Sequence, residues 1–293
     1  GKIVAHRKTS ETDREELAEL MVGRKVLLRV DKVTANVGKT ELKVEHLNVT
    51  DDAGVHRVKD VNFEVHSGEI VGIAGVSGNG QSELMDVITG IKPIQEGQIK
   101  IKNETITPAL NTDAAAMRRF GMGHVPEDRQ RRGLVTSFSA NENIILGYHK
   151  DPAYNRFLEM DRDAIVQSCT EQMEHFDVRP SNPFLRTTLF SGGNQQKLVV
   201  AREMERDPNL LVVGQPTRGV DIGAIEFIHR QIIAMRDAGK AVLLISVELD
   251  EILSLSDRIL VMFDGQIMGE VMAKDANERD IGLLMAGVQK DVA

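Results

Sequence analysis

The sequence predicts an α/β protein built on a mostly parallel sheet. Hydrophobic, strand-like runs bounded by glycine or proline alternate along the chain with runs of helical periodicity. Alternation of this kind places helices on the faces of a parallel sheet. In addition, 41% of the 293 residues are hydrophobic, which is ample for a buried core.

The individual elements follow from the same patterns. The clearest strands are expected at residues 69–73, 210–213, 241–246 and 258–263. Helices are expected at residues 81–89, 195–206, 222–238 and 249–255. Residues 128–190 break the alternation, because they are polar, helical in pattern and poor in strands. We interpret this stretch as an inserted helical subdomain.

The two ends of the chain share a spaced pattern of identical residues. The first copy consists of Gly1, Ile3, Leu20, Met21 and Gly23, and the second of Gly265, Ile267, Leu284, Met285 and Gly287. If the match is real, residues 1–33 are the tail of an upstream copy of the domain formed by residues 34–293, and the natural protein is a tandem repeat. The alternative is that any short strand, loop and amphipathic helix ending in glycine shows such a pattern.

The composition excludes several classes of protein. A formal net charge of -8 argues against nucleic-acid binding, because phosphate backbones are held by fields of lysine and arginine. The local basic run at residues 129–132 is expected to be a solvated loop. The single cysteine, Cys169, rules out an internal disulfide and is expected to be structural. No run of about 18 apolar residues occurs, so we expect a soluble, cytoplasmic chain.

A glycine-rich turn between an expected strand and an expected helix is the first candidate site. The segment GIAGVSGNGQSELMDV, residues 72–87, matches the phosphate-loop pattern G-x-x-x-x-G-K-[ST] at Gly75, Gly80 and Ser82, with Gln81 in place of lysine. Backbone N–H groups in such a turn converge on an anion, and the helix N-terminus adds a favourable partial charge. The candidate phosphate-binding residues are Gly75, Ser77, Gly78, Asn79, Gly80, Gln81 and Ser82.

A second stretch carries a resemblance to a known family. Residues 189–221 read LFSGGNQQKLVVAREMERDPNLLVVGQPTRGVD, in which Ser191-Gly192-Gly193-Asn194 resembles the signature motif of the ABC-transporter ATPases. The resemblance covers nearly all of residues 34–272. Segments similar to the second halves of tandem ATPase subunits from simple-sugar and nucleoside importers are 126–129, 194–197 and 216–221. Segments that look most like the nucleoside branch, which works with lipoprotein receptors of the basic-membrane-protein type, are 78–84, 215–218, 224–229 and 248–252.

The resemblance implies a P-loop ABC-ATPase core with a mostly parallel sheet, an antiparallel N-terminal β-subdomain and the inserted helical subdomain. It also implies ATP and Mg²⁺ as cofactors and head-to-tail pairing of two domains, with each ATP between the glycine loop of one and the signature of the other. Residues 191–194 would then serve a nucleotide bound to the upstream domain, and Asp221 would line the domain interface. The alternatives are a plain helix cap at Ser191 and an ordinary solvated turn at Asp221.

Several departures from the family pattern bear on catalysis. Gly214 and Gln215 stand where the family has an aspartate that helps to hold Mg²⁺ and a glutamate that activates water. Val247 replaces the switch histidine, and Gln81 replaces the lysine of the loop. Loss of the general base alone is expected to cost about 10²–10⁴-fold in rate. We therefore predict that this half alone is poorly active or inactive as an ATPase.

The loop keeps features that would bind nucleotide weakly. Its backbone N–H groups and the Ser82 hydroxyl are retained, and Glu127 stands where the family usually has glutamine. Ser82 and Glu127 are the candidate metal ligands. His56 falls near the position where the family sets an aromatic ring against adenine, but we expect a surface histidine there.

The resemblance also implies partners and a location. A peripheral position at the cytoplasmic face of the membrane, with transmembrane permease subunits and, indirectly, an extracytoplasmic substrate-binding protein, would suit an importer of nucleosides or, alternatively, of simple sugars. Residues 127–134 would border the permease groove, where Arg129, Arg131 and Arg132 would meet acidic partner residues or lipid headgroups.

Two rival functions use the same family resemblance. A soluble tandem ABC protein acting on ribosomes would need a basic linker and should retain its acidic catalytic residues, and the sequence shows neither. A non-catalytic regulatory module would leave ATP hydrolysis unchanged when Ser191 or Gly193 is altered in the full-length protein.

Overall fold

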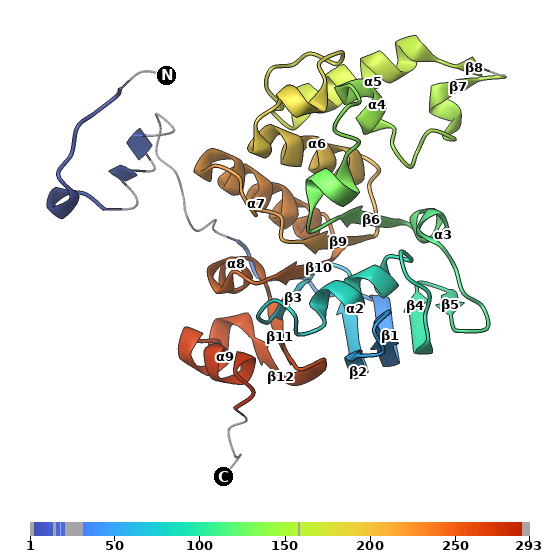
Figure 1. The fold of residues 1–293 in the computed structure, drawn as a ribbon, viewed down its shortest axis with the longest axis vertical. Helices are drawn as coiled ribbons and strands as arrows, with labels where there is room; N and C mark the ends of the chain where they lie inside the picture. Colours follow the sequence, from blue (N-terminus) through green and yellow to red (C-terminus); the bar gives the residue numbers. More distant parts are fainter. Residues whose placement is uncertain (1–2, 14–15, 18, 21–31, 158, 289–293) are drawn as a thin grey trace.

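Two sheets and a helical lobe form the body of the chain (Figure 1). The computed structural model describes residues 3–13, 16–17, 19–20, 32–157 and 159–288. The central sheet has the strand order β12-β11-β3-β10-β9-β6. Its strands are β3 (Ile70–Ala74), β6 (Met122–Val125), β9 (Leu210–Gly214), β10 (Ala241–Ser246), β11 (Arg258–Phe263) and β12 (Gln266–Met272). All neighbours are parallel except β12, which is antiparallel to β11, so the predicted mostly parallel sheet is confirmed.

Three of the inner strands show why the sequence identified this sheet. Every residue of β3, β9 and β10 is buried, as expected for parallel strands that are covered on both faces and read as continuous apolar runs. The predicted strands at 241–246 and 258–263 and the predicted helix at 249–255 are confirmed residue for residue.

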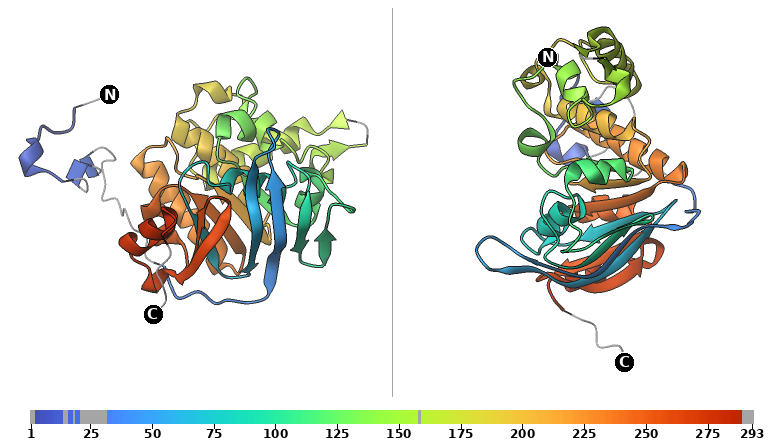
Figure 2. Two further views of the ribbon diagram at one scale, coloured as in Figure 1. Left: turned by 60° about the horizontal axis from the view of Figure 1, so that its bottom comes forward. Right: turned by 90° about the vertical axis from the view of Figure 1, so that its right-hand side faces the viewer.

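A four-stranded antiparallel sheet, with the order β2-β1-β4-β5, confirms the expected β-subdomain. Its strands are β1 (Thr40–Thr50), β2 (His56–His66), β4 (Glu96–Ile101) and β5 (Glu104–Ile106). Helix α2 (Gln81–Ile88) shares one hydrophobic core with this sheet and with one face of the central sheet. In the right-hand view of Figure 2 the antiparallel sheet lies at one end of the molecule and the helical lobe at the other.

The helices of the lobe and of the opposite face of the central sheet share a second core. They are α4 (Ala140–Ile144), α5 (Arg162–His175), α6 (Gly192–Met204), α7 (Ile222–Asp237), α8 (Leu249–Leu255) and α9 (Glu278–Met285), and α3 (Ala114–Arg119) precedes β6. Single turns and a small hairpin complete the chain: η1 (Thr9–Glu11), η2 (Arg129–Gly133), η3 (Pro152–Tyr154), β7 (Asn155–Arg156), β8 (Glu159–Met160), η4 (Thr187–Leu189) and η5 (Ala273–Asp275).

The stretch 128–190 has helices and helical turns as its main regular structure, as predicted, and its described strands are only the two-residue strands of the hairpin. Cys169 is buried in α5, and burial raises the pKa of its thiol to about 12, in agreement with a structural role. No helix in the described ranges is long and apolar enough to cross a membrane.

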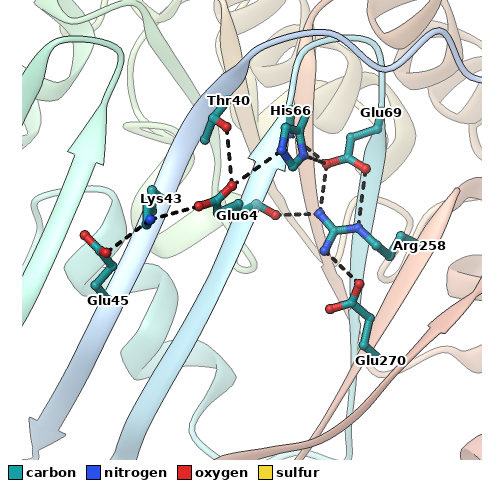
Figure 3. Close-up of polar contacts among 8 residues, drawn as sticks. All are labelled: Thr40, Lys43, Glu45, Glu64, His66, Glu69, Arg258 and Glu270. Carbon is teal, nitrogen blue, oxygen red and sulfur yellow. Dashed lines mark hydrogen bonds and ion pairs between the residues drawn. The ribbon is translucent and has the colours of Figure 1, made fainter.

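A charged network ties the two sheets together (Figure 3). Arg258 of β11 donates to the carboxylate of Glu69 at 2.9 Å and to the carbonyl oxygen of Glu64 at 2.6 Å, and it also pairs with Glu270 of β12. The His66 ring contacts the Glu69 carboxylate at 2.7 Å. Glu69 is almost completely buried and Arg258 is largely buried, and the pair fixes the antiparallel sheet against the first residues of β3.

The predicted repeat at the two ends stays a prediction. In the later copy, Ile267 lies on β12 and Leu284 on α9. In the first copy, Gly1, Met21 and Gly23 lie outside the described residues. Lys32 lies just before the proposed domain boundary near residue 34. Its Nζ donates to the carbonyl oxygen of Leu255, at the end of α8, at 2.9 Å.

Candidate functional site

The candidate site lies along one edge of the central sheet. Strands β3, β6, β9 and β10 are parallel neighbours, so the loops that follow them leave the same edge. The loop after β3 is the glycine-rich turn, and the other three loops carry the positions that depart from the family pattern, Glu127, Gly214, Gln215 and Val247. The fold therefore brings together residues that lie far apart in the sequence.

The glycine loop has the backbone of an anion-binding turn. Gly78 and Gly80 have φ values of +93° and +98°, which side chains rarely tolerate, and a Cβ on Gly80 would clash with the carbonyl oxygen of Arg57. Asn79 fixes the loop from one side by accepting from the N–H of Asp264 at 3.3 Å. Ser77 is exposed. Within the described chain, nothing accepts a hydrogen bond from the N–H groups of the first helical turn, Gln81 and Ser82.

Gln81 folds back over this loop. Its side chain is buried, and its amide nitrogen lies so close to Gly75 that a Cβ there would clash with it. The amide nitrogen has no hydrogen-bond partner among the residues that the structure describes. A buried donor without a partner costs about 1–3 kcal/mol, so an acceptor that reached this group would gain from pairing with it. The amide brings no positive charge, in contrast to a lysine.

Gly214 shows why no carboxylate stands at the end of β9. A Cβ at this position would lie 2.7 Å from Cγ of Glu127 and 2.8 Å from Sδ of Met85. Both atoms belong to side chains that fill the volume of the missing group. The sequence revealed only the absence of an oxygen ligand and missed Met85, whose visible signal was no more than an apolar position on the helix after the loop.

Neither of the other two departures supplies a catalytic group. Gln215 adopts a left-handed backbone, with φ of 47°, and its N–H donates to the carbonyl oxygen of Ile245 at 2.8 Å. Val247 follows β10 with an apolar side chain. His56 opens β2 as an exposed residue, which confirms the surface position expected for it.

The two predicted metal ligands are in direct contact. The Ser82 hydroxyl donates to Oε2 of Glu127 at 2.8 Å. A hydroxyl and a carboxylate are oxygen ligands that suit Mg²⁺, which commonly takes one or two protein ligands and completes its shell with phosphate and water. The residues present therefore fit Mg²⁺ held jointly with a nucleotide. No cluster of three or more acidic, histidine or cysteine side chains suited to a metal was found in the described parts of the chain.

The signature turn caps a helix at a different place. Ser191 precedes α6, and its hydroxyl oxygen accepts from the N–H of Asn194 at 3.3 Å and from the Asn194 amide at 2.9 Å. The helix begins at Gly192 and not near residue 195 as predicted, because the serine cap allows the two glycines to form its first turn. No hydrogen bond or ion pair of the described residues joins 75–82 to 191–194.

Both signature glycines are packed against the turn that contains Asp221. A Cβ on Gly193 would lie 2.7 Å from Oδ2 of Asp221, and a Cβ on Gly192 would lie 2.9 Å from the carbonyl oxygen of Gly219. Asp221 itself caps α7 by accepting from the N–H of Ala224 at 2.9 Å. The structure thus joins the signature turn and the Asp221 turn into one surface.

Residues 130–132 are exposed, as predicted for a solvated segment, but two of the arginines at 129–132 also have partners within the chain. These residues form the turn η2, in which Arg132 pairs with the buried Asp86 of α2 and Arg129 donates to two backbone carbonyl oxygens. Arg131 is the most exposed of the three arginines, with 87% of its side chain accessible, and the Arg132 side chain is 45% exposed. The sequence showed a basic run, but the acceptors that hold two of its arginines come from distant segments.

Comparisons with known proteins agree with this geometry. The family profile described as "ABC transporter" matches residues 58–218. The nucleoside import ATP-binding protein NupA of Lactococcus lactis subsp. cremoris (strain MG1363) is 44% identical over 98% of this chain and 56% of its own length. The guanosine import ATP-binding protein NupO of Bacillus subtilis (strain 168) is 42% identical over the same shares. The glucose import ATP-binding protein TsgD13 of Haloferax volcanii is 40% identical over 98% of this chain and 52% of its own length.

Solved structures with the same fold are ATP-binding cassettes. A nucleotide-free cassette from an ABC transporter superposes with a TM-score of 0.68 at 22% identity, covering 85% of this chain and 96% of its own. The cassette MJ0796, solved as a dimer in a post-hydrolysis state with ADP and Pi, gives a TM-score of 0.67 at 22% identity and covers 79% of this chain and 98% of its own. The chain spans about half the length of the curated relatives it matches. With its two sheets, glycine loop, signature turn and matching profile, the chain belongs to the ABC transporter family, as an ATPase domain of the cassette fold.

Proposed function

We propose that this chain is the C-terminal ATP-binding half of an importer subunit and that it shares its working ATP site with an upstream cassette. The observation that carries the proposal is the contrast between two sites. The glycine-loop site has no lysine at Gln81 and no carboxylate at Gly214 or Gln215, and its Gly214 position is closed by Met85 and Glu127. The signature turn, by comparison, keeps the serine cap and the two glycines.

The composite site follows from the chemistry of the signature turn. A capped helix start that presents N–H groups without bulky side chains suits a phosphate, because the N–H groups and the helix dipole both favour negative charge. In a head-to-tail pair, Ser191, Gly192 and Gly193 would approach the nucleotide of the upstream cassette. The dimeric form of MJ0796 is consistent with pairing of this kind.

The chain's own loop would bind nucleotide without hydrolysing it efficiently. Backbone N–H groups and the Gln81 amide would hold the phosphates, and Ser82 and Glu127 would hold Mg²⁺. Bound there, Mg²⁺ would neutralise phosphate charge. No carboxylate stands at Gly214 or Gln215 to act on water, so the hydrolytic work falls to the composite site.

The dependence of binding on Mg²⁺ can be tested directly. Glu127 brings negative charge to a pocket without lysine, so nucleotide binding by the chain is expected to be weak and to need Mg²⁺. Substitution E127Q removes that charge and is expected to strengthen binding of Mg²⁺-free ATP while weakening the Mg²⁺ effect. Calorimetric titration of ATP, with Mg²⁺ or with EDTA, measures both. Tight ATP binding by the unmodified chain, or an unchanged Mg²⁺ dependence in E127Q, would contradict this assignment.

Nucleosides are the proposed cargo, and simple sugars are the second candidate. Relatives named for nucleoside and guanosine import are 44% and 42% identical to this chain, and relatives named for glucose and ribose import are 40% and 34% identical. The proposed partners are transmembrane permease subunits at the cytoplasmic face of the membrane and, indirectly, an extracytoplasmic substrate-binding protein. Uptake of labelled guanosine and of labelled ribose or glucose by the reconstituted transporter distinguishes the two cargoes.

A non-catalytic regulatory module is a third candidate, and the signature turn tests it. In the full-length subunit, G193D places a carboxylate where the Cβ alone would already meet Asp221. We expect ATP hydrolysis to fall strongly, because a negative group would face the phosphate of the composite site. Unchanged hydrolysis in a folded G193D subunit would favour the regulatory module.

A further inference from the structure

Arg129 lies where three functional segments meet. It opens η2, directly after the segment that contains Glu127. Its Nη1 donates to the carbonyl oxygen of Arg218 at 2.6 Å, and its Nη2 donates to that of Gly219 at 3.1 Å. The same Nη2 lies 2.7 Å from the Cβ position of Gly192. One guanidinium therefore touches the Glu127 segment, the turn before Asp221 and the signature turn.

An arginine is specifically suited to this place. Its planar fork can donate to two successive carbonyl oxygens at once, whereas a lysine ammonium would reach one of them as a point charge. Gly219 has a left-handed φ of +64°, which turns the backbone at the carbonyl groups that accept from the Arg129 guanidinium. The fork thus recognises the shape of this turn.

The partners of Arg129 distinguish it from an ordinary stabilising ion pair. Its hydrogen bonds to described residues go only to carbonyl oxygens, no carboxylate of the described chain lies within ion-pair distance, and its Nε is buried without an acceptor. A partly buried cation whose hydrogen-bond partners are neutral, and which has one unused donor, stabilises a fold poorly. This arrangement is better explained by positioning of the turn than by stability.

The turn η2 is also fixed on its other side. Arg132 pairs with Asp86, which lies on the helix that starts at the glycine loop. A displacement of residues 127–133 would therefore act on α2 through Arg132 and on residues 218–219 through Arg129. The two arginines make this segment a bridge between the chain's own loop and the surface that holds the signature turn.

We propose that Arg129 is a positioning residue that transmits movement of the 127–133 segment to the Arg218–Gly219 turn and the signature turn. The inference rests on the proposed function, in which that segment faces the permease and the signature turn completes the composite ATP site. When the permease moves this segment, the two hydrogen bonds of the Arg129 guanidinium displace the Arg218–Gly219 turn, which lies beside Gly192. The expectation that Arg129, Arg131 and Arg132 meet acidic partner residues or lipid headgroups stays a separate prediction.

The test measures coupling separately from hydrolysis. The full-length subunit, assembled with its permease in proteoliposomes, is assayed for ATP hydrolysis with and without substrate-loaded binding protein, as wild type, R129A and R129K. We expect R129A to retain its unstimulated rate within about twofold and to lose stimulation by about fivefold or more, the lower end of ordinary coupling between sites. R129K, which keeps the charge and one hydrogen bond, is expected to fall between the two.

The control is R162A, which removes an exposed arginine at the start of α5. It is expected to change neither rate nor stimulation. Stimulation in R129A equal to wild type would overturn the inference, as would a proportional loss of both rates together with a lower melting temperature. If R129A does not fold, R129K decides the question: reduced stimulation supports the inference, and wild-type stimulation overturns it.

A parallel G193D sample tests the composite ATP site separately from the role of Arg129. If G193D loses hydrolysis and R129A keeps full stimulation, the composite site stands and only the role of Arg129 fails. If G193D hydrolyses ATP like wild type, the proposed function itself fails.

Discussion

At the end of β9, two side chains occupy the space that a metal-binding carboxylate would need. Gly214 is the residue that permits this, because Glu127 and Met85 lie within 2.8 Å of its Cβ position. Restoring an aspartate alone would therefore create a clash and no functional site. The missing carboxylate at Gly214 and the packing of Met85 therefore depend on each other, because Met85 occupies the space that the carboxylate would need.

This packing leads to a stability prediction. G214A is expected to destabilise the chain by about 1–3 kcal/mol, the usual cost of overpacking a core, because the buried Met85 must move. The matched control is G282A on α9, where a Cβ meets open space; it is expected to stabilise the helix by about 0.5–1 kcal/mol. Urea unfolding of both variants measures the difference.

The role of Met85 is isolated by a double-mutant cycle. M85A and G214A together are expected to cost less than the sum of the single changes by about 0.5–3 kcal/mol, since they share one cavity. Strict additivity would show that Met85 does not fill the site.

His124 on β6 links the core to pH. Burial lowers its pKa to about 4, and its Nε2 has no partner among the described residues. The unfolded chain, with an ordinary histidine pKa near 6.5, binds the proton first as the pH falls. Stability should therefore decrease between pH 6.5 and pH 4, by an amount on the order of 3 kcal/mol for this group.

The measurement is urea unfolding at pH 7, 6, 5 and 4. H124Q is expected to lose this part of the pH dependence, and H46Q, at a histidine with 78% side-chain exposure, is expected to keep it. Identical pH profiles for H124Q and the unmodified chain would show that another group is responsible.

At the scale of single elements, the sequence patterns identified strands and helices where one physical effect dominates. The strand 241–246 is an uninterrupted apolar run, and helix 249–255 is set between two strands, so both were predicted with their observed bounds. The start of α6 was misplaced because the serine cap and two glycines looked like a loop. The polar residues suggested a loop, whereas the hydrogen bonds of the serine cap, which extend the helix to Gly192, form only in the folded chain.

The internal contacts of the turn η2 were missed for a different reason. Its arginines form a basic run that usually indicates a solvated segment, and the groups that engage them, Asp86 and the 218–219 carbonyls, are distant in the sequence. The same is true of Met85 beside Gly214. The sequence showed which polar groups are absent from the candidate site. Only the packed structure showed which side chains occupy their place.

The network in Figure 3 gives a prediction for the contact between the two sheets. R258A leaves the buried Glu69 carboxylate without its cationic partner and is expected to cost about 3–5 kcal/mol. E270Q removes only the partner of Arg258 that is 52% exposed, and is expected to cost less than about 1 kcal/mol. Thermal and urea unfolding measure both, and equal effects would show that the buried pair does not hold the sheets together.

For the whole molecule, the account is a division of labour. The fold is that of an ATP-binding cassette, and its family membership is established by the profile match. The proposed division gives this half the signature turn, the Asp221 turn and the Arg129 bridge. The upstream cassette would supply the charged groups that cleave ATP. The sequence predicted this division from the departures together with the retained signature motif and the pairing that the family resemblance implies, and measurements in solution can test it.

The most direct measurement is the steady-state ATPase rate of the purified chain beside that of the full-length subunit, both with Mg²⁺. A preparation of the chain carrying S82A controls for contaminating enzymes. The account predicts that the chain alone shows no turnover beyond that of S82A, while the full-length subunit hydrolyses ATP. Sustained hydrolysis by the chain alone that S82A abolishes would contradict it.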